Sequence, residues 1–176
     1  MTENLIYGVW GAGFHRIVRY EKPAKLQKAH QLGKPYNLTI GEDPENPDCF
    51  LEIGINGYIH VGFIDELKRR CLMCYFATEL PGRLMLYKAA YDEYDGDTDT
   101  VIKMTEFIFT TLGQFNIVIT DYVNREKEIL KANNEVDVSG LWTDYPEFGC
   151  YDGLIKVAER FPKNLKNFDW NDMQII

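Results

Sequence analysis

The sequence predicts a single domain (residues 1–176) of mainly β structure: a curved antiparallel sheet or barrel of eight or nine strands with two or three short helices. Three observations predict this fold class. Short segments rich in β-branched and aromatic residues recur along the chain, and turn signals separate them. The connections are short, which favours antiparallel pairing in meander order. An apolar fraction of 45% is enough for one hydrophobic core.

The predicted strands follow one another closely. In chain order they are Leu5–Trp10, Phe14–Tyr20, Tyr36–Gly41, Cys49–Ile55, Tyr58–Ile64, Arg70–Glu79, Arg83–Asp92, Lys103–Thr111 and Phe115–Tyr122. Between the first two, Gly11-Ala12-Gly13 either kinks one long strand or closes a hairpin. Pro81-Gly82 and Leu112-Gly113-Gln114 each predict a further hairpin.

The clearest local signal is Asn56-Gly57. This pair is typical of a two-residue type I′ turn, in which both central residues have positive φ. Such a turn would pair Ile53 with His60 across the hairpin. Both faces of that hairpin are apolar, so we expect it to be covered on both sides.

Three segments are predicted as helices. The first, Ala24–Leu32, follows Pro23 and contains no β-branched residue. The chain changes to a helical pattern over Tyr122–Asn133. A third helix near 148–161 places its apolar side chains on one stripe before a proline ends it. Part of the tail to Ile176 is expected to pack against the domain.

Charge and composition restrict the class of protein. The formal net charge is −8, which disfavours nucleic acid and anionic membranes as partners and favours basic surfaces. No apolar run is long enough to cross a bilayer. The first ten residues lack the basic region and apolar core of a signal peptide, so a cytoplasmic location is expected.

Neither a metal nor another cofactor is expected. Cys71 and Cys74 have the spacing of half a zinc ribbon or of a redox motif. They lie in a predicted strand, however, where residues three apart point to opposite faces. Asp95–Glu106 has carboxylates at positions 1, 3, 5 and 12 of a calcium-binding loop. Because Thr100 replaces the glycine that such a loop needs, tight calcium binding is not expected.

The sequence contains no complete catalytic motif, and we predict that the protein is not an enzyme. His15, His30 and His60 are isolated, and none belongs to a histidine-pair metal motif or a nucleophile elbow. Gly11 and Gly13 lack the third glycine and the helix of a dinucleotide-binding site. A surplus of acidic residues makes carboxylate pairs inevitable, so such pairs do not indicate catalysis.

The distribution of charge is the functional signal that remains. Glu42–Asp48 and Asp92–Asp99 are acidic clusters without a basic residue, and Leu141–Tyr151 mixes aromatic with acidic residues. Aromatic side chains supply anchors, and carboxylates pair with Lys and Arg, so these segments suit a basic protein partner. The candidate partner-binding residues are Asp92, Glu93, Asp95, Asp97, Asp99, Trp142, Asp144, Tyr145 and Glu147.

In size, acidity and lack of catalytic residues, the chain resembles the immunity proteins of bacterial contact-dependent-inhibition and related polymorphic toxin systems. The resemblance implies a protein that binds and neutralises one cognate basic toxin domain, a nuclease, by covering its active-site cleft. The distance between the acidic and aromatic segments is not fixed by the sequence. Finding them at opposite ends of the molecule would count against this partner surface.

A second resemblance provides the alternative. Gly8-Val9-Trp10 and Thr120-Asp121-Tyr122 are similar to the Gly-x-Trp and Thr-Asp-Tyr signatures of lipocalins, which are eight-stranded barrels with a C-terminal helix. This resemblance implies a barrel that binds a small apolar ligand, with Trp10 packed at its closed end. A continuous apolar cavity inside the barrel would favour this alternative.

Overall fold

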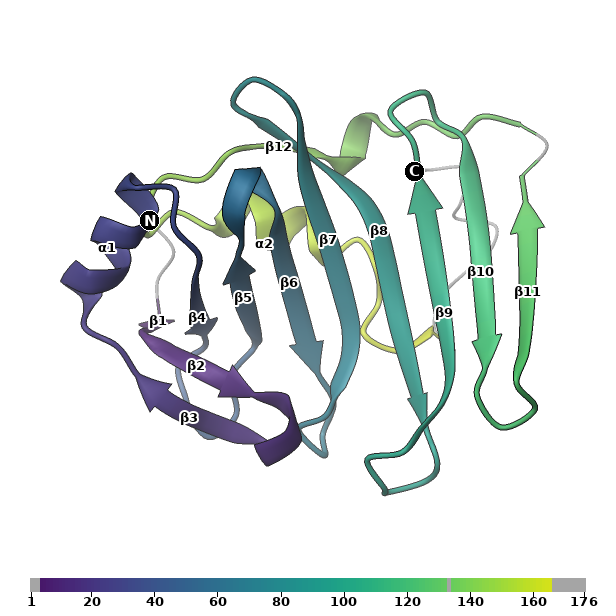
Figure 1. Ribbon diagram of the computed structural model, residues 1–176, viewed down its shortest axis with the longest axis horizontal. Helices are drawn as coiled ribbons and strands as arrows, with labels where there is room; N and C mark the ends of the chain where they lie inside the picture. Colours follow the sequence, from purple (N-terminus) through teal and green to yellow (C-terminus); the bar gives the residue numbers. More distant parts are fainter. Residues whose placement is uncertain (1–3, 133, 166–176) are drawn as a thin grey trace.

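The computed structural model describes residues 4–132 and 134–165 (Figure 1). The predicted packing of the tail lies largely outside these residues. The strands are β1 (Leu5–Ile6), β2 (Gly8–Gly11), β3 (Arg16–Tyr20), β4 (Tyr36–Ile40), β5 (Cys49–Ile53), β6 (Ile59–Ile64), β7 (Arg70–Leu80), β8 (Arg83–Tyr94), β9 (Val101–Phe109), β10 (Phe115–Asp121), β11 (Glu126–Lys131) and β12 (Trp142–Asp144). The helices are α1 (Pro23–Gln31) and α2 (Asp152–Ala158).

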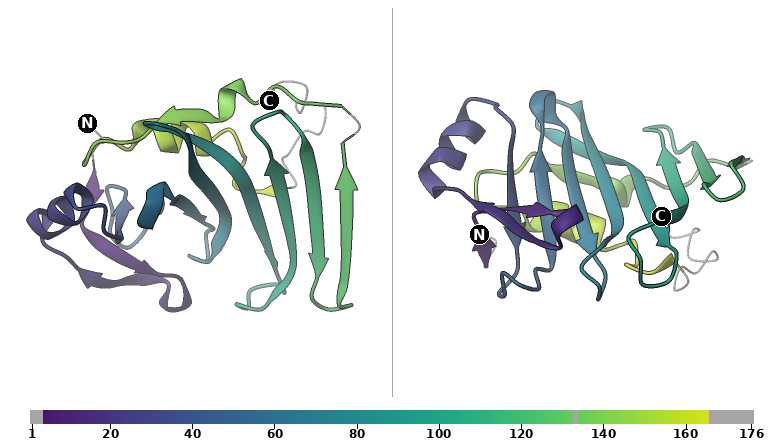
Figure 2. Two further views of the ribbon diagram at one scale, coloured as in Figure 1. Left: turned by 45° about the horizontal axis from the view of Figure 1, so that its top comes forward. Right: turned by 60° about the horizontal axis from the view of Figure 1, so that its bottom comes forward.

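One large antiparallel sheet dominates the structure and confirms the predicted fold class. Its strand order is β1-β4-β5-β6-β7-β8-β9-β10-β11, and β12 pairs with the beginning of β8. The hairpins predicted at Pro81-Gly82 and Leu112-Gly113-Gln114 are both present. The sheet is curved but open, with β1 and β11 as separate edges (Figure 2). It therefore does not close into the barrel that the lipocalin resemblance implies.

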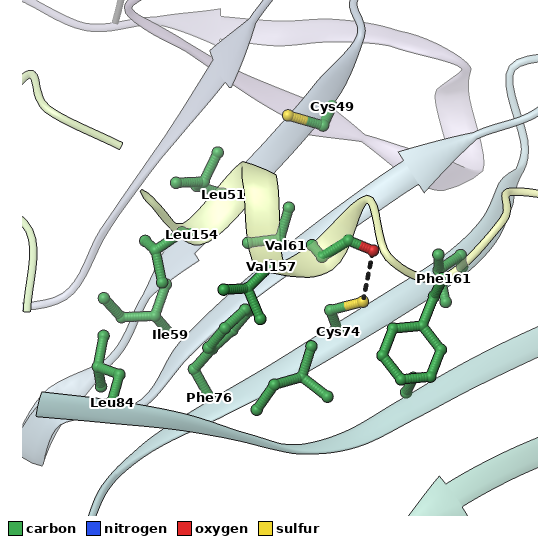
Figure 3. Packing of buried hydrophobic residues seen from close by; sticks show 14 of the residues in the cluster. Cys49, Leu51, Ile59, Val61, Cys74, Phe76, Leu84, Leu154, Val157 and Phe161 are labelled. Carbon is green, nitrogen blue, oxygen red and sulfur yellow. Dashed lines mark hydrogen bonds between the residues drawn. The ribbon is translucent and has the colours of Figure 1, made fainter. Parts of the chain in front are cut away.

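Helix α2 covers one face of the sheet. Leu154 and Val157 of this helix pack with Phe161 over the apolar side chains of β5 to β8 (Figure 3). The strand register aligns a row of six buried residues under them: Leu51, Val61, Cys74, Ala89, Phe107 and Ile117. Burial of a large apolar side chain contributes about 1.5–3 kcal/mol, and this row lies within the main core cluster.

The β2–β3 hairpin covers part of the opposite face. Trp10 packs there with Phe50, Ile64 and Met73 in a second apolar cluster, and not at the end of a barrel. A 3-10 turn joins β2 to β3, so the Gly11–Gly13 segment closes a hairpin. Gly62 makes room for this layer, because a Cβ atom there would lie 2.1 Å from Cζ of Phe50.

Two of the three predicted helices are present, and the prediction of a helix in the segment after β10 is wrong. Helix α1 matches its predicted segment, and α2 is shorter than 148–161. The predicted helix over Tyr122–Asn133 is instead a turn followed by β11, in which Ile129 pairs with Val118. The segment contains good helix formers, but the strand hydrogen bonds offered by β10 outweigh that local preference.

The connection between β5 and β6 also differs from its prediction. Gly57 has a φ of +78°, but a 3-10 turn over Ile55–Gly57 replaces the type I′ turn. Ile53 therefore pairs with Ile59 and not with His60. Because a one-residue change in register moves side chains to the other face, the two isoleucines share the core face.

We predict that Gly57→Ala lowers the free energy of unfolding by about 1–3 kcal/mol. An added methyl group would lie 2.0 Å from Oγ1 of Thr78, and positive φ adds backbone strain. Gly82→Ala is the matched control, because Gly82 has a φ of +74° but open space around it. Urea unfolding should show the larger loss at Gly57. Equal losses would contradict the close approach of the β5–β6 turn to Thr78 of β7.

Candidate functional site

Four loops of the large sheet lie at one of its ends, because consecutive turns of an antiparallel meander alternate between the two ends. They follow β4, β6, β8 and β10 at the lower edge in Figure 1. We call the first three, residues 41–48, 65–69 and 95–100, the acidic end. They carry nine carboxylates against only Lys68 and Arg69, and the carboxylates belong to Glu42, Asp43, Glu45, Asp48, Asp65, Glu66, Asp95, Asp97 and Asp99.

Arg69 joins the loop after β6 to the loop after β8. Its Nε and Nη2 atoms lie 2.9 and 2.8 Å from Oδ2 of Asp65. Its Nη1 atom donates to the carbonyl oxygens of Gly96 and Thr98, at 2.8 and 2.7 Å. The guanidinium also lies over the Tyr94 ring, 4.3 Å from its centroid. The Arg69 side chain is only 11% exposed, so these charge-assisted hydrogen bonds hold the loop at residues 95–100 firmly.

The loop after β4 is held in the same region. Oε2 of Glu45 lies 3.9 Å from Nζ of Lys68 in the loop after β6. The Asp43 carboxylate accepts a hydrogen bond from the backbone N–H of Glu45, which holds the pKa of Asp43 below its ordinary value. From the β2–β3 turn, Nε2 of His15 lies 3.1 Å from Oδ1 of Asp99. The two acidic clusters are therefore close neighbours in the fold.

Not all of the acidic candidates are accessible to a partner. The Asp92 side chain is only 4% exposed, and Nε of Arg70 donates to its Oδ2 at 2.7 Å. A buried and paired carboxylate is not free to contact another protein, so Asp92 is removed from the candidate surface. The remaining four are exposed: Glu93, Asp95, Asp97 and Asp99.

The aromatic segment lies at the other end of the sheet. Trp142 pairs with Met85 and Asp144 with Arg83, at the beginning of β8, whereas Asp95 follows the last residue of that strand. At about 3.3 Å per residue, β8 separates the two segments by about 35 Å. The sequence left the distance between the two segments open, and their separation counts against a partner surface formed by both. The structure brings together the two acidic clusters instead.

The aromatic candidates are partly buried in the fold. The Arg83 guanidinium lies 5.3 Å from the centroid of the Trp142 ring, and Trp142 packs against the main core. The Tyr145 ring lies 6.1 Å from the ring of His30 on α1. Asp144 and Glu147 are exposed. Tyr145 thus lines a small pocket and is not an exposed side chain that could anchor a partner protein.

A cleft of about 910 Å³ opens beside the acidic loops. Its lining includes the exposed carboxylates of Glu66, Glu93 and Asp97, which have no partner in the described part of the chain. Tyr91 also lines it, and the buried Tyr91 hydroxyl lacks a hydrogen-bond partner among the described residues. Glu66 was missed by sequence reasoning, because its segment carries equal numbers of acidic and basic residues.

The described residues contain no group of three or more His, Cys, Asp or Glu side chains that could hold a metal ion. Cys71 and Cys74 are free thiols on β7, as predicted from the strand pattern. Burial raises the pKa of Cys71 to about 11 and also raises that of Cys74. Both thiols are therefore protonated at neutral pH, and Cys74 is also fully buried.

The described helices include none that is long and apolar enough to span a membrane. Comparisons with protein-family models, with curated proteins and with solved structures found no match to this chain.

We predict that Arg69→Met mobilises the loop after β8. The change keeps much of the side-chain packing but removes the hydrogen bonds to Gly96 and Thr98. Amide hydrogen exchange over residues 95–100, measured by NMR, should become at least about tenfold faster. The matched control is Arg19→Met, because the Arg19 side chain is 68% exposed and its Nε lies 2.7 Å from Oε1 of Glu21, outside this loop. Unchanged exchange in Arg69→Met would show that the loop is ordered by other contacts.

Proposed function

We propose that this protein is a non-catalytic inhibitor that binds a basic partner protein through its acidic end, as an immunity protein binds its toxin. The observation that carries the proposal is the convergence of two acidic clusters, far apart in the sequence, on one end of the sheet. The partner that fits best is a toxin nuclease, because such an enzyme presents a basic cleft to nucleic acid. Carboxylates of the inhibitor would stand where phosphates lie in the substrate complex.

The electrostatics of the acidic end support rapid association. Clustered charges of one sign attract an oppositely charged protein over a distance and increase the association rate. Glu66, Glu93 and Asp97 are exposed and have no ion-pair partner among the described residues. Their charge is thus available to a partner. The same potential disfavours nucleic acid and anionic membranes as ligands.

The rigidity of the acidic end supports specific binding. Binding costs less free energy when the contacting groups already hold their bound positions. Arg69 fixes the backbone at Gly96 and Thr98, on either side of Asp97. The carboxylates are therefore displayed on an ordered framework. Inhibition of this kind requires no cofactor. The inhibitor would act in the cytoplasm, where the producing cell must neutralise its toxin.

We predict that the combined change of Asp95, Asp97 and Asp99 to Asn slows association by about tenfold at low ionic strength. It should also flatten the dependence of the association rate on salt. The fold should survive, because exposed carboxylates contribute little to stability. Stopped-flow binding to the basic nuclease domain of the cognate toxin measures both effects.

The matched control removes three acidic groups from the opposite end of the sheet: Glu79→Gln, Asp144→Asn and Glu147→Gln. All three residues are exposed, and the change in net charge is the same. This variant should associate nearly as fast as the unmodified protein. An equal slowing in both variants would show that total charge, and not the acidic end, attracts the partner. The absence of any complex with the nuclease would overturn the proposed function itself.

A further inference from the structure

A small pocket of about 280 Å³ lies at the end of the sheet opposite the acidic loops. It is formed by the C-terminal end of α1, the loop between β5 and β6, and the segment after β12. The lining residues that matter here are His30, Lys34, Tyr36, Ile53 and Tyr145. The pocket is distinct from the surface proposed for the protein partner.

A buried chain of hydrogen bonds runs from the core to this pocket. The Oη atoms of Tyr36 and Tyr151 lie 2.9 Å apart, and Oη of Tyr36 lies 2.8 Å from Nδ1 of His30. Tyr36 is 6% exposed and Tyr151 is 0% exposed. Two phenylalanines could fill this space at little loss of stability, because a buried hydroxyl pair adds little net free energy. The main structural effect of these hydrogen bonds is to orient the His30 imidazole.

The oriented imidazole has one nitrogen left for a ligand. Its Nδ1 atom is held toward Tyr36, so Nε2, on the other side of the ring, is directed away from that contact. Burial lowers the pKa of His30, which keeps the ring neutral near pH 7. When the Tyr36 hydroxyl donates a hydrogen bond to Nδ1, the neutral ring carries its proton on Nε2, which is then a hydrogen-bond donor.

The other polar groups of the pocket are also donors. Nζ of Lys34 and Oη of Tyr145 have no hydrogen-bond partner in the described part of the chain. None of the described lining residues is acidic, although the chain has 27 acidic residues against 19 basic ones. Ile53 and the Tyr145 ring add an apolar wall. A cation, an imidazole N–H and a phenol beside an apolar wall complement a carboxylate attached to a compact apolar group.

We propose that this pocket binds a small carboxylic acid with a compact apolar body. The carboxylate accepts hydrogen bonds from Lys34, His30 and Tyr145, and the apolar body packs against Ile53 and the Tyr145 ring. Binding selects the arrangement in which Tyr36 donates to Nδ1 of His30.

The test uses phenylacetate as the probe and NMR as the readout. Phenylacetate should cause saturable shifts in the amides of Gly33 and Gly54, which line the pocket, and should increase the population of the His30 tautomer protonated on Nε2. Phenylacetamide, which lacks the charge, should bind about tenfold more weakly. Benzylamine should not shift these signals. If benzylamine binds and phenylacetate does not, the proposed ligand class is wrong.

Three variants connect the binding to the proposed contacts. Lys34→Met should weaken phenylacetate binding about tenfold. Lys28→Met is the matched control, because Lys28 is an exposed lysine of α1 outside the pocket. Tyr36→Phe should keep the fold but weaken binding and remove the tautomer preference of His30. The absence of saturable shifts in the folded, unmodified protein would overturn the proposal. Binding that is insensitive to Lys34→Met would overturn it as well.

Discussion

The guanidinium of Arg69 is the contact on which the acidic end depends. The meander brings alternate loops to one end of the sheet, but like charges in those loops repel one another. Arg69 places one positive charge between Asp65 and the backbone carbonyls of Gly96 and Thr98. Because this side chain is largely buried, its hydrogen bonds are little weakened by solvent and salt. Order and high negative charge can therefore coexist in the same loops.

The two ends of the sheet carry opposite chemistry. One end presents carboxylates on three loops, and the other contains a pocket in which Lys34 and His30 are potential donors. Helix α2 and the β2–β3 hairpin cover opposite faces of the sheet near its middle strands. β8 runs from the region of β12 to the acidic loop and thus links the ends through one rigid element. The two proposed sites are separate enough to be tested independently.

The sequence predicts the strands and hairpins well because alternating apolar residues and glycine turns are local signals. It fails at β11, where the pairing partner and not local preference decides the structure. The register at Asn56-Gly57 was recoverable, since pairing Glu52 with His60 puts the polar residues together and leaves the apolar ones on the core face. Which loops meet in space depends on the order of strands. The close approach of the two acidic clusters could therefore be seen only in the structure.

The most direct test of the account is paramagnetic relaxation enhancement from a spin label at Asp97→Cys. Cys71 and Cys150 are first changed to Ser, while Cys49 and Cys74 are buried and do not react. We predict strong broadening of amide signals from residues 42–48, in the other acidic cluster. Signals from residues 142–147, in the aromatic segment, should keep their intensity. Broadening of the aromatic segment with no effect on residues 42–48 would contradict the account.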